Sequence, residues 1–535
     1  MANGSVRDVV GRWISDAFHT VEVASDHRHL HSRRGDRRPT VNQGLMPGIL
    51  AAAQIERLED RTVLDADPYG TMGGIPGRTT TNTSPPPGTT TTTIPPTTTT
   101  GSTGSTTGGG TVAGTFLSNI GGGALRPNGQ QWFETFGTDP LSGVVAVHRD
   151  LPGGLSLNYS SDTAVAKPII AVDTTWNSTS LPTGPLTATL KIGGVTQSSV
   201  TIDHTGIQQG SPLRIVLQAT SNLPSGKYDA QIEVVSSTGM ISQTQTLTQS
   251  VLVENRESSP FGRGWTVTGL ERLVPQTGGT VFISGAGYKD WYGSTGMAMP
   301  GMMANSPLVQ QTDQTWRLNL PDGGFHTFDV SGRLNSKVDG QGNTVTYGWD
   351  SISGLLTSVS DVFGRITNLN YLKGKLSNVV DFAGRFVNLT HDANGQLQTI
   401  TSHSAAAMGP WAPPVMTYSY NAEGLLASSV DQAQRTTLLT YSFSGRLASA
   451  VLPNGGTWSF APVALVGLAN TASGVGTTTS PATRTLPANA LATWTNPLGE
   501  IQQLGVDSLG NVIRSIDPLG AETVMTVTPT DECLQ

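Results

Sequence analysis

The sequence predicts a mainly β protein, with a repeated array of short antiparallel strands in its C-terminal half. Charged residues make up 13% of the chain, about half the share usual in soluble domains, and there are 64 glycines among 535 residues. Long helix-forming runs of Lys, Glu, Ala and Leu are almost absent. After residue 319, glycine-containing turn sequences return about every 20 residues. These observations favour short strands and many turns over helices.

Charge and cysteine content exclude several classes of protein. The formal net charge is −7, whereas proteins that bind nucleic acid cluster Lys and Arg, so we predict no nucleic-acid partner. The single cysteine, Cys533, leaves no intrachain disulfide. No window reaches the roughly 18 apolar residues of a transmembrane helix. The N-terminus also lacks the continuous apolar stretch of an ordinary signal peptide.

The first 111 residues predict a leader followed by a linker. Residues 1–77 contain a basic stretch at Arg28–Arg38, which we interpret as a disordered leader, and the sequence IERLEDRTVL at Ile55–Leu64. That sequence resembles the LEPR-XLL-type motif of large exported proteins of planctomycete-type bacteria. Residues 78–111 are nearly all Thr, Ser, Gly and Pro, so they cannot bury enough apolar surface to fold. A Thr-rich spacer of this type favours an exported, extracellular or envelope-associated location.

Residues 112–255 predict an Ig-like antiparallel β-sandwich. Apolar and polar residues alternate there in short runs, and turn sequences separate the runs. Val, Ile and Leu residues, together with Trp176, supply a core. The clearest runs are Val144–Val147, Leu186–Ile192, Leu213–Leu217 and Tyr228–Val235, with turns at Pro152–Gly154, Gly193-Gly194 and Pro224–Gly226.

Residues 256–318 predict a β segment that opens the repeat array. It begins with SPFGRGWTVTGLERL at Ser259–Leu273. Its first two glycines allow tight backbone turns, while Phe261 and Trp265 supply anchoring bulk.

The fold prediction depends mainly on a sequence repeat at residues 319–535. Gly342 and Gly364 are 22 residues apart, and Gly364 and Gly384 are 20 residues apart. A half-period of 10 residues separates Gly374 from Gly384. A period of about 20 residues is typical of a solenoid or wrapped array, and its half accommodates one strand and one turn.

Each turn of the repeat reads Asp-x-x-Gly or a close variant, often followed by Arg. The Asp side chain can cap the amides of its own turn, and Gly accepts a positive φ. A recurring Tyr offers an apolar body to the neighbouring coil and a hydroxyl to solvent or backbone. The predicted structural turn residues are Asp339, Gly342, Asp361, Gly364, Arg365, Asp381, Gly384, Arg385, Gly395, Gly424, Asp431, Gly445, Arg446, Asp507, Gly510, Asp517 and Gly520.

This pattern resembles the YD repeat of the RHS family, whose consensus is similar to Tyr-Asp-x-x-Gly-Arg-Leu followed by a second Asp-x-x-Gly. The copies here are imperfect, because Tyr-Asp is replaced by Phe328-Asp329, Trp349-Asp350 and His391-Asp392. The PFGRGW run at residues 260–265 resembles the segment that opens the β-shell of RHS proteins. The resemblance covers residues 256–535 and implies an antiparallel sheet wrapped into a partial shell. RHS relatives enclose a C-terminal toxin in such a shell, and teneurins use it in cell-surface adhesion.

We predict no catalytic, cofactor-binding or metal-binding residue. G-x-S-x-G, G-x-x-x-x-G-K-[ST] and H-E-x-x-H sequences do not occur. One carboxylate per turn favours turn capping over a calcium loop. His27, His29 and His31 are interpreted as part of the basic leader and not as a metal site. The sequence DPLG at Asp517–Gly520 is similar to the self-cleaving site of RHS shells, but Pro-Leu-Gly recurs at Pro497–Gly499, so we assign it to the repeat.

Three classes of function follow from the sequence. The first is a non-enzymatic exported scaffold for cell-surface adhesion or interaction, with surface proteins or glycans as partners. The second is the N-terminal part of a toxin-delivery shell, with a toxin encoded downstream. Because Pro529–Gln535 follows the last copy where Tyr-Asp is expected, we hypothesise a truncated frame, which sequencing beyond Gln535 tests. The third is a carbohydrate-binding surface protein, which a glycan screen of residues 112–255 tests.

Overall fold

The computed structural model is mainly β, as the sequence predicts. The residues that it describes are 114–117, 137–176, 179–238, 241–296, 305–403, 415–431, 434–507, 512–527 and 533–534. The predicted leader and linker, with the motif at residues 55–64, lie outside them. The described helices are short: α2 (Ser161–Ala164), η1 (Pro152–Gly154), η2 (Val463–Leu465), η3 (Thr471–Ser473) and η4 (Pro487–Asn489).

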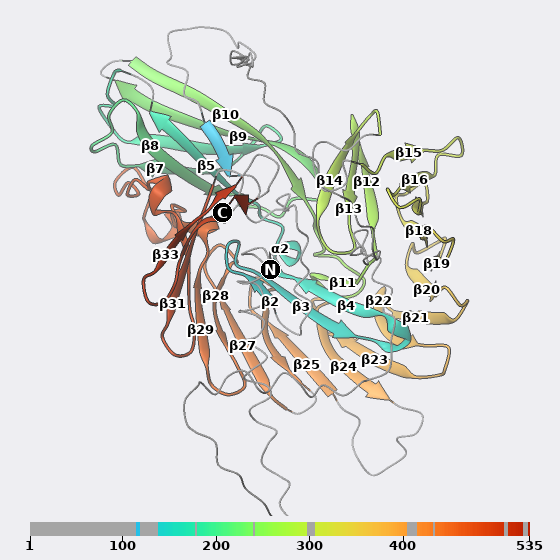
Figure 1. The fold of residues 1–535 in the computed structure, drawn as a ribbon. Coiled ribbons are helices and arrows are strands. Elements are labelled where there is room, and N and C mark those ends of the chain that lie inside the picture. Colours follow the sequence, from blue (N-terminus) through green and yellow to red (C-terminus); the bar gives the residue numbers. More distant parts are fainter. Residues whose placement is uncertain are drawn as a thin grey trace, which may run out of the picture.

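One antiparallel sheet of 19 strands dominates the described part of the chain, and its strands lie side by side in sequence order. They are β15 (Leu308–Gln310), β16 (Trp316–Asn319), β17 (Phe325–Phe328), β18 (Leu334–Val338), β19 (Thr344–Trp349), β20 (Leu356–Ser360), β21 (Ile366–Leu372), β22 (Lys375–Val380), β23 (Phe386–His391), β24 (Leu397–His403), β25 (Val415–Tyr420), β26 (Leu426–Val430), β27 (Thr436–Tyr441), β28 (Leu447–Val451), β29 (Thr457–Ala461), β30 (Leu491–Thr495), β31 (Ile501–Val506), β32 (Val512–Ile516) and β33 (Glu522–Val524). The sheet curves from β15 through β23 to β31 and does not close on itself (Figure 1). It therefore forms a partial shell.

The solvent face of this large sheet is polar but carries little charge. In β21, Thr367 and Leu369 are buried whereas Asn368 and Asn370 are exposed, which is the alternation expected of a strand. The Asn370 amide donates to Asn378 Oδ1 at 3.0 Å, and the Asn378 amide donates to Asn388 at 2.9 Å. Further cross-strand pairs of Ser and Thr hydroxyls continue the pattern at 2.7 Å. Such pairs help to fix the register of neighbouring strands.

The opposite, concave face is apolar and is covered by a second sheet of this same chain. That sheet contains β2 (Gly137–Asp139), β3 (Val144–Asp150), β4 (Ser156–Ser160) and β11 (Trp265–Val267), in the order β11-β4-β3-β2. We call it the inner sheet. It lies inside the curve of the large sheet (Figure 1). Val145, Val147 and Leu157 of the inner sheet share one core with leucines and valines of β20 to β31.

The segment predicted as one sandwich contributes to two cores. β5 (Ile169–Trp176) pairs with β1 (Gly114–Leu117) on one side and with β8 (Ser211–Gln218) on the other. A second sheet contains β6 (Leu186–Ile192), β7 (Val195–Ile202), β9 (Gly226–Thr238) and β10 (Ile241–Val253). Ile170 and Ile215 face that second sheet and share its core. Ala171 and Val216, on the other face of β5 and β8, belong to the core of the large sheet, as do β3 and β4.

The remaining strands form two small sheets. β12 (Arg272–Gln276), β13 (Gly279–Ile283) and β14 (Lys289–Gly293) form a three-stranded sheet, and β34 (Thr526–Val527) pairs with β35 (Cys533–Leu534). The Leu273 amide donates to Gly332 O at 2.8 Å and so links this small sheet to a turn of the array. The connection between β29 and β30 reaches back to the sandwich, where Arg214 N donates to Thr485 O at 3.0 Å.

Gly332 and Gly384 allow a first prediction. Both have a positive φ, of 81° and 77°, but a Cβ at Gly384 would meet open space whereas one at Gly332 would lie 2.3 Å from Leu273 O. We expect Gly384→Ala to cost about 1 kcal/mol from backbone strain alone. Gly332→Ala should cost at least about 2 kcal/mol more, because the contact with Leu273 must open. Urea denaturation of the two variants checks this, and equal losses would contradict it.

Candidate functional site

The repeated turn is built on one carboxylate that accepts hydrogen bonds from its own loop. Asp361 Oδ1 accepts from the amides of Phe363 and Arg365, each at 2.9 Å. Asp361 Oδ2 accepts from Arg365 Nε at 2.6 Å, and Gly364 N donates to Asp361 O at 2.9 Å. Burial pushes the pKa of Asp361 upward, but the bonds from Arg365 and the backbone outweigh it and hold the pKa below its usual value. The carboxylate thus caps its own turn.

Other predicted turn residues adopt the same geometry. The carboxylates of Asp339, Asp381, Asp431 and Asp517 each accept from the amide four residues later, and Arg385 and Arg435 pair with their aspartates. The glycines of these and the alternate turns have φ between 75° and 87°; they are Gly342, Gly364, Gly384, Gly395, Gly424, Gly445 and Gly520.

Three predicted residues differ from this scheme. Ser442 occupies the Asp position before Arg446, and the Arg446 side chain is buried near Asp139 and Asp162 of the N-terminal segments. Asp507 is the last described residue before its turn, and Gly510 lies outside the described residues.

Removing one cap should weaken the array measurably. Asp381 is 3% exposed and accepts from Ala383 N, Arg385 N and Arg385 Nε. We expect Asp381→Ala to cost about 2 kcal/mol, as other buried caps do, and Asp381→Asn to cost less because its Oδ1 still accepts. Thermal unfolding of both variants measures the difference. Asp381→Ala as stable as the native chain would refute the capping role.

A β-bulge recurs at the end of alternate strands and brings an aromatic ring with it. The register shifts at Trp349, Tyr371, Tyr420 and Tyr441, among others. Tyr371 Oη donates to Leu356 O at 2.8 Å, Tyr420 Oη to Leu397 O at 2.9 Å and Tyr441 Oη to Leu426 O at 2.8 Å. Burial raises the pKa of each hydroxyl, which keeps it a donor. The predicted Tyr hydroxyl therefore bonds to backbone.

The bulges also direct three amides of the large sheet toward N-terminal parts of the chain. Leu376 N donates to Pro260 O at 2.8 Å, Leu426 N to the Tyr159 hydroxyl at 3.0 Å and Leu447 N to Gly143 O at 2.9 Å. These leucines occupy equivalent positions, each opposite the aromatic residue of a bulge. We call these three contacts the docking seam. No sequence pattern predicts the groups that accept these hydrogen bonds. The recurring Gly-x-Leu sequence, however, marks the three leucines whose amides donate them.

Trp265 lies at the centre of the docking seam. Its indole is fully buried and its Nε1 donates to Tyr420 Oη at 2.9 Å. The ring centroid is 5.4 Å from that of Tyr159 and 5.2 Å from that of Tyr418. Arg149 adds a second link, because its Nε donates to Tyr418 Oη at 2.9 Å and its Nη2 to Ser429 Oγ at 3.1 Å.

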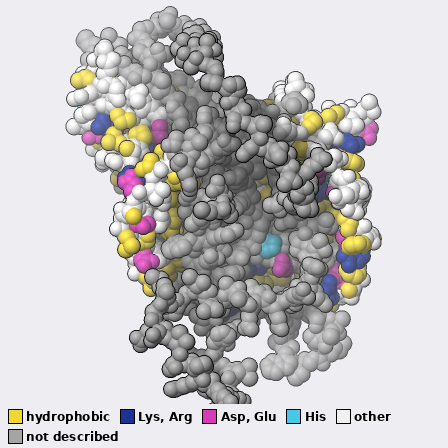
Figure 2. Space-filling model, viewed as in Figure 1, with side chains coloured by type: hydrophobic (Ala, Val, Ile, Leu, Met, Phe, Trp, Pro, Cys, Tyr) yellow, Lys and Arg dark blue, Asp and Glu magenta, His cyan; other side chains and the backbone are white. Residues whose placement is uncertain are grey.

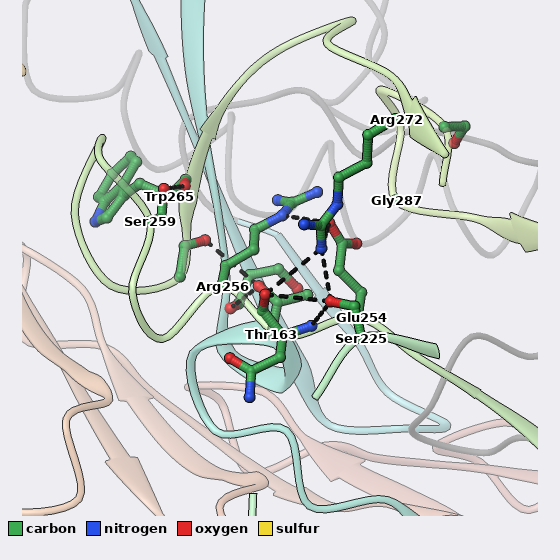
Figure 3. A network of polar contacts seen from close by, with 12 residues as sticks. Thr163, Ser225, Glu254, Arg256, Ser259, Trp265, Arg272 and Gly287 are labelled. Atoms are coloured by element: carbon green, nitrogen blue, oxygen red, sulfur yellow. Dashed lines mark hydrogen bonds and ion pairs between the residues drawn. The ribbon is translucent and has the colours of Figure 1, made fainter. Parts of the chain in front are cut away.

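A polar network joins the opening segment to residues that precede it in the chain (Figure 3). Buried Glu254 accepts from Arg256 Nε at 2.6 Å and lies 3.7 Å from Arg272 Nη2. Arg272 also donates to Ser225 Oγ at 2.7 Å, while Arg256 N donates to Thr163 O at 2.8 Å. The network therefore links the residue that follows β10, the opening segment and α2.

A second buried charge cluster joins the opening segment to the first repeats. The Glu271 carboxylate accepts from His326 Nδ1 at 2.7 Å and from Lys337 Nζ at 2.9 Å. Burial alone would raise the pKa of Glu271, but Lys337 and His326 lower it to about 2. No sequence motif points to this cluster, because His326 and Lys337 follow Glu271 by 55 and 66 residues.

Two surface features remain available for contact. One is a row of exposed turn tips, where the Arg365 guanidinium lies between the rings of Phe363 and Phe382, 5.0 and 4.6 Å from their centroids. Hydrophobic and basic side chains gather along the margin that carries β20 and β21 (Figure 2). The other is a polar pocket of about 590 Å³ between residues 257–263 and the turns that follow β23 and β25.

Two further findings concern the described residues only. They contain no group of three or more His, Cys, Asp or Glu side chains placed to hold a metal ion. Within the same ranges, no helix is long and apolar enough to cross a bilayer.

Comparison with known proteins gives matches at the level of structure. No family model matches the sequence, and no curated protein matches it. The crystal structure of TcdB2-TccC3 is 10% identical with a TM-score of 0.25, and the match covers 78% of this chain and 24% of that one. TcdB2-TccC3-Cdc42 is 9% identical (TM-score 0.25, 73% and 24% covered), and TcdB2-TccC3-TEV is 11% identical (TM-score 0.24, 73% and 20% covered). This chain thus spans a quarter or less of the length of these structures.

Proposed function

We propose that this chain is a non-enzymatic, exported β-repeat scaffold of the RHS/YD kind that makes contacts at the cell surface. The observation that carries the proposal is the filled concave face. Inner-sheet residues such as Val147 and Tyr159 share a core with the concave side of the large sheet, and the docking seam fixes them there. What the molecule offers to a partner is therefore its outer face, its turn tips and its pocket.

The outer surfaces suit contact by shape and hydrogen bonding. Ser, Thr and Asn side chains form the solvent face of the middle strands, and Phe363 and Phe382 are 77% and 51% exposed at the turns. Exposed aromatic tips beside a guanidinium are typical of protein interaction surfaces. Surface proteins or glycans are the proposed partners.

A toxin-delivery shell is the second candidate, and the shape of the large sheet favours it. The sheet is curved, and within the described residues β15 and β33 each pair on one side only, so further strands could extend the wall. The inner sheet argues against cargo along β20 to β31, because an enclosed domain there would have to displace Trp265 and the docking seam.

Adhesion of the full chain tests the first candidate. Beads coated with the native chain should adhere to envelope preparations from the producing cells several-fold more than beads coated with heat-denatured chain. The double variant Phe363→Ser, Phe382→Ser should adhere less than the native chain. Val195→Ser, a control at another exposed apolar residue, should adhere as well as the native chain. Equal adherence of native and denatured chain would reject the proposal.

A further inference from the structure

The polar pocket is formed where the opening segment meets the edge of the large sheet. Glu257 and Arg263 line it from the opening segment, and Lys375 lines it from the start of β22. Asn394, Gln396 and Asn421 line it from the turns that follow β23 and β25. Its volume of about 590 Å³ is within the range of pockets that bind small ligands.

The two cations of the pocket are held in place before any ligand arrives. Lys375 Nζ donates to Ser259 O at 2.7 Å, and Arg263 Nε donates to Ala164 O at 2.8 Å. Arg263 Nη2 is 3.1 Å from Glu257 Oε1. Because these side chains are already anchored, they lose less conformational entropy when a ligand binds.

Two turn glycines permit this close approach. A Cβ at Gly424 would lie 2.5 Å from Arg263 Nη1, and a Cβ at Gly395 would lie 2.7 Å from Lys375 Cε. Gly395 and Gly424 therefore meet a steric requirement of the pocket in addition to their positive φ.

Gln396 supplies an independent sign of a ligand. It is 5% exposed and lines the pocket, yet its side-chain amide has no hydrogen-bond partner among the described residues. Its backbone is fully engaged, since Gln396 N donates to Asp392 Oδ1 and Gln396 O accepts from Asp392 N. An amide that lines the pocket without a hydrogen bond to the described residues is available to donate to and accept from a bound molecule.

The lining defines the chemistry of that molecule. Side-chain amides both donate and accept, which matches sugar hydroxyls, and Glu257 adds an acceptor for them. Arg263 and Lys375 together match one carboxylate. Among the described residues, no aromatic side chain lines the pocket, which disfavours a flat apolar ligand. We propose that the pocket binds a uronic acid unit of an acidic glycan, through its carboxylate to the two cations and its hydroxyls to the amides.

This proposal rests on the surface interaction proposed above and names a ligand for it. The test uses soluble ligands and no cells, so the two proposals can fail separately. Trigalacturonic acid is titrated calorimetrically into the full native chain. Its methyl ester, which keeps the hydroxyls and loses the charge, and acetate, which keeps only the charge, are the matched ligands. Binding without adherence of coated beads would reject adhesion alone; adherence without binding would reject this site alone.

Two lysines of one hairpin give matched variants. Lys375→Gln removes a cation of the pocket, whereas Lys373→Gln removes an exposed cation at the preceding turn that does not line it. We expect the acid to bind, the ester to bind at least about tenfold more weakly, and Lys375→Gln to weaken binding by about tenfold or more, as loss of a charge-assisted hydrogen bond does. Lys373→Gln should bind the acid with nearly native affinity. The unfolding temperatures of both variants should stay close to that of the native chain.

Three results would overturn the proposal. The native chain could fail to bind the trisaccharide at millimolar concentration. Acetate could bind as tightly as the trisaccharide, which would make the pocket a plain anion site. The two lysine variants could lose equal affinity while both remain folded, which would make the effect one of net charge.

Discussion

Replacing Trp265 with alanine is expected to lower the free energy of unfolding by about 4 kcal/mol, at the upper end of the range for a fully buried aromatic side chain. The indole is fully buried between Tyr159 and Tyr418 and donates to Tyr420 Oη. Its loss removes a large side chain from the interface of the inner and large sheets and leaves a cavity that rigid strands cannot close. Urea denaturation followed by far-ultraviolet circular dichroism measures the free energy of unfolding.

Two controls separate burial from hydrogen bonding at this position. Trp291→Ala removes a half-buried indole of β14 that stacks against Lys227, and should cost about 2 kcal/mol or less. Tyr420→Phe keeps the ring but removes the hydroxyl that accepts from Trp265 and donates to Leu397 O, and should cost about 1–2 kcal/mol. If Trp265→Ala were no more damaging than Trp291→Ala, the docking of the inner sheet would have to be rejected.

Glu271→Gln is expected to have the second largest effect, a loss of about 3 kcal/mol at neutral pH. The carboxylate is buried and accepts from both Lys337 Nζ and His326 Nδ1, so a neutral amide removes the negative charge that faces Lys337 in this cluster. Glu233→Gln is the matched control, since Glu233 pairs with Lys191 at 2.6 Å with both side chains about 30% exposed. It should cost about 1 kcal/mol or less.

The same group sets an acid dependence of stability. Because the pKa of Glu271 is about 2 in the folded chain and about 4.5 when unfolded, the ionised form stabilises the fold above pH 4.5. That contribution, about 3 kcal/mol, declines as the pH falls from 4.5 and is lost near pH 2. Native and Glu271→Gln chains should therefore converge in stability at low pH. A constant difference between them from pH 7 to pH 2.5 would show that Glu271 does not titrate with a depressed pKa.

The turns of the array could be predicted from sequence because each one depends on local chemistry. Asp361 and Gly364 are three residues apart, and the hydrogen bonds and positive φ that they supply are confined to their own loop. The antiparallel order follows from the same local rule, since strands joined by short turns pair with their neighbours. The mainly β class was therefore predictable.

The inner sheet could not be predicted because its partners are distant in the chain. Tyr159 meets Leu426 across 267 residues, and Arg149 meets Ser429 across 280. The alternation in β3 and β4 indicates one buried face but does not say which surface buries it, so a sandwich was the simpler prediction. The pocket escaped prediction for the same reason, since Arg263, Lys375 and Gln396 converge only through the long-range contacts of the seam.

Amide hydrogen exchange at the docking seam tests the central claim, that the chain fills the concave face of its own sheet. The amides of Leu376, Leu426 and Leu447 donate to Pro260, Tyr159 and Gly143, outside the large sheet. If the inner sheet is docked, these three amides should exchange as slowly as those paired within the large sheet, and Trp265→Ala should accelerate them first. Exchange at the rate of open turns, with the neighbouring strand amides still protected, would show an empty concave face and contradict the account.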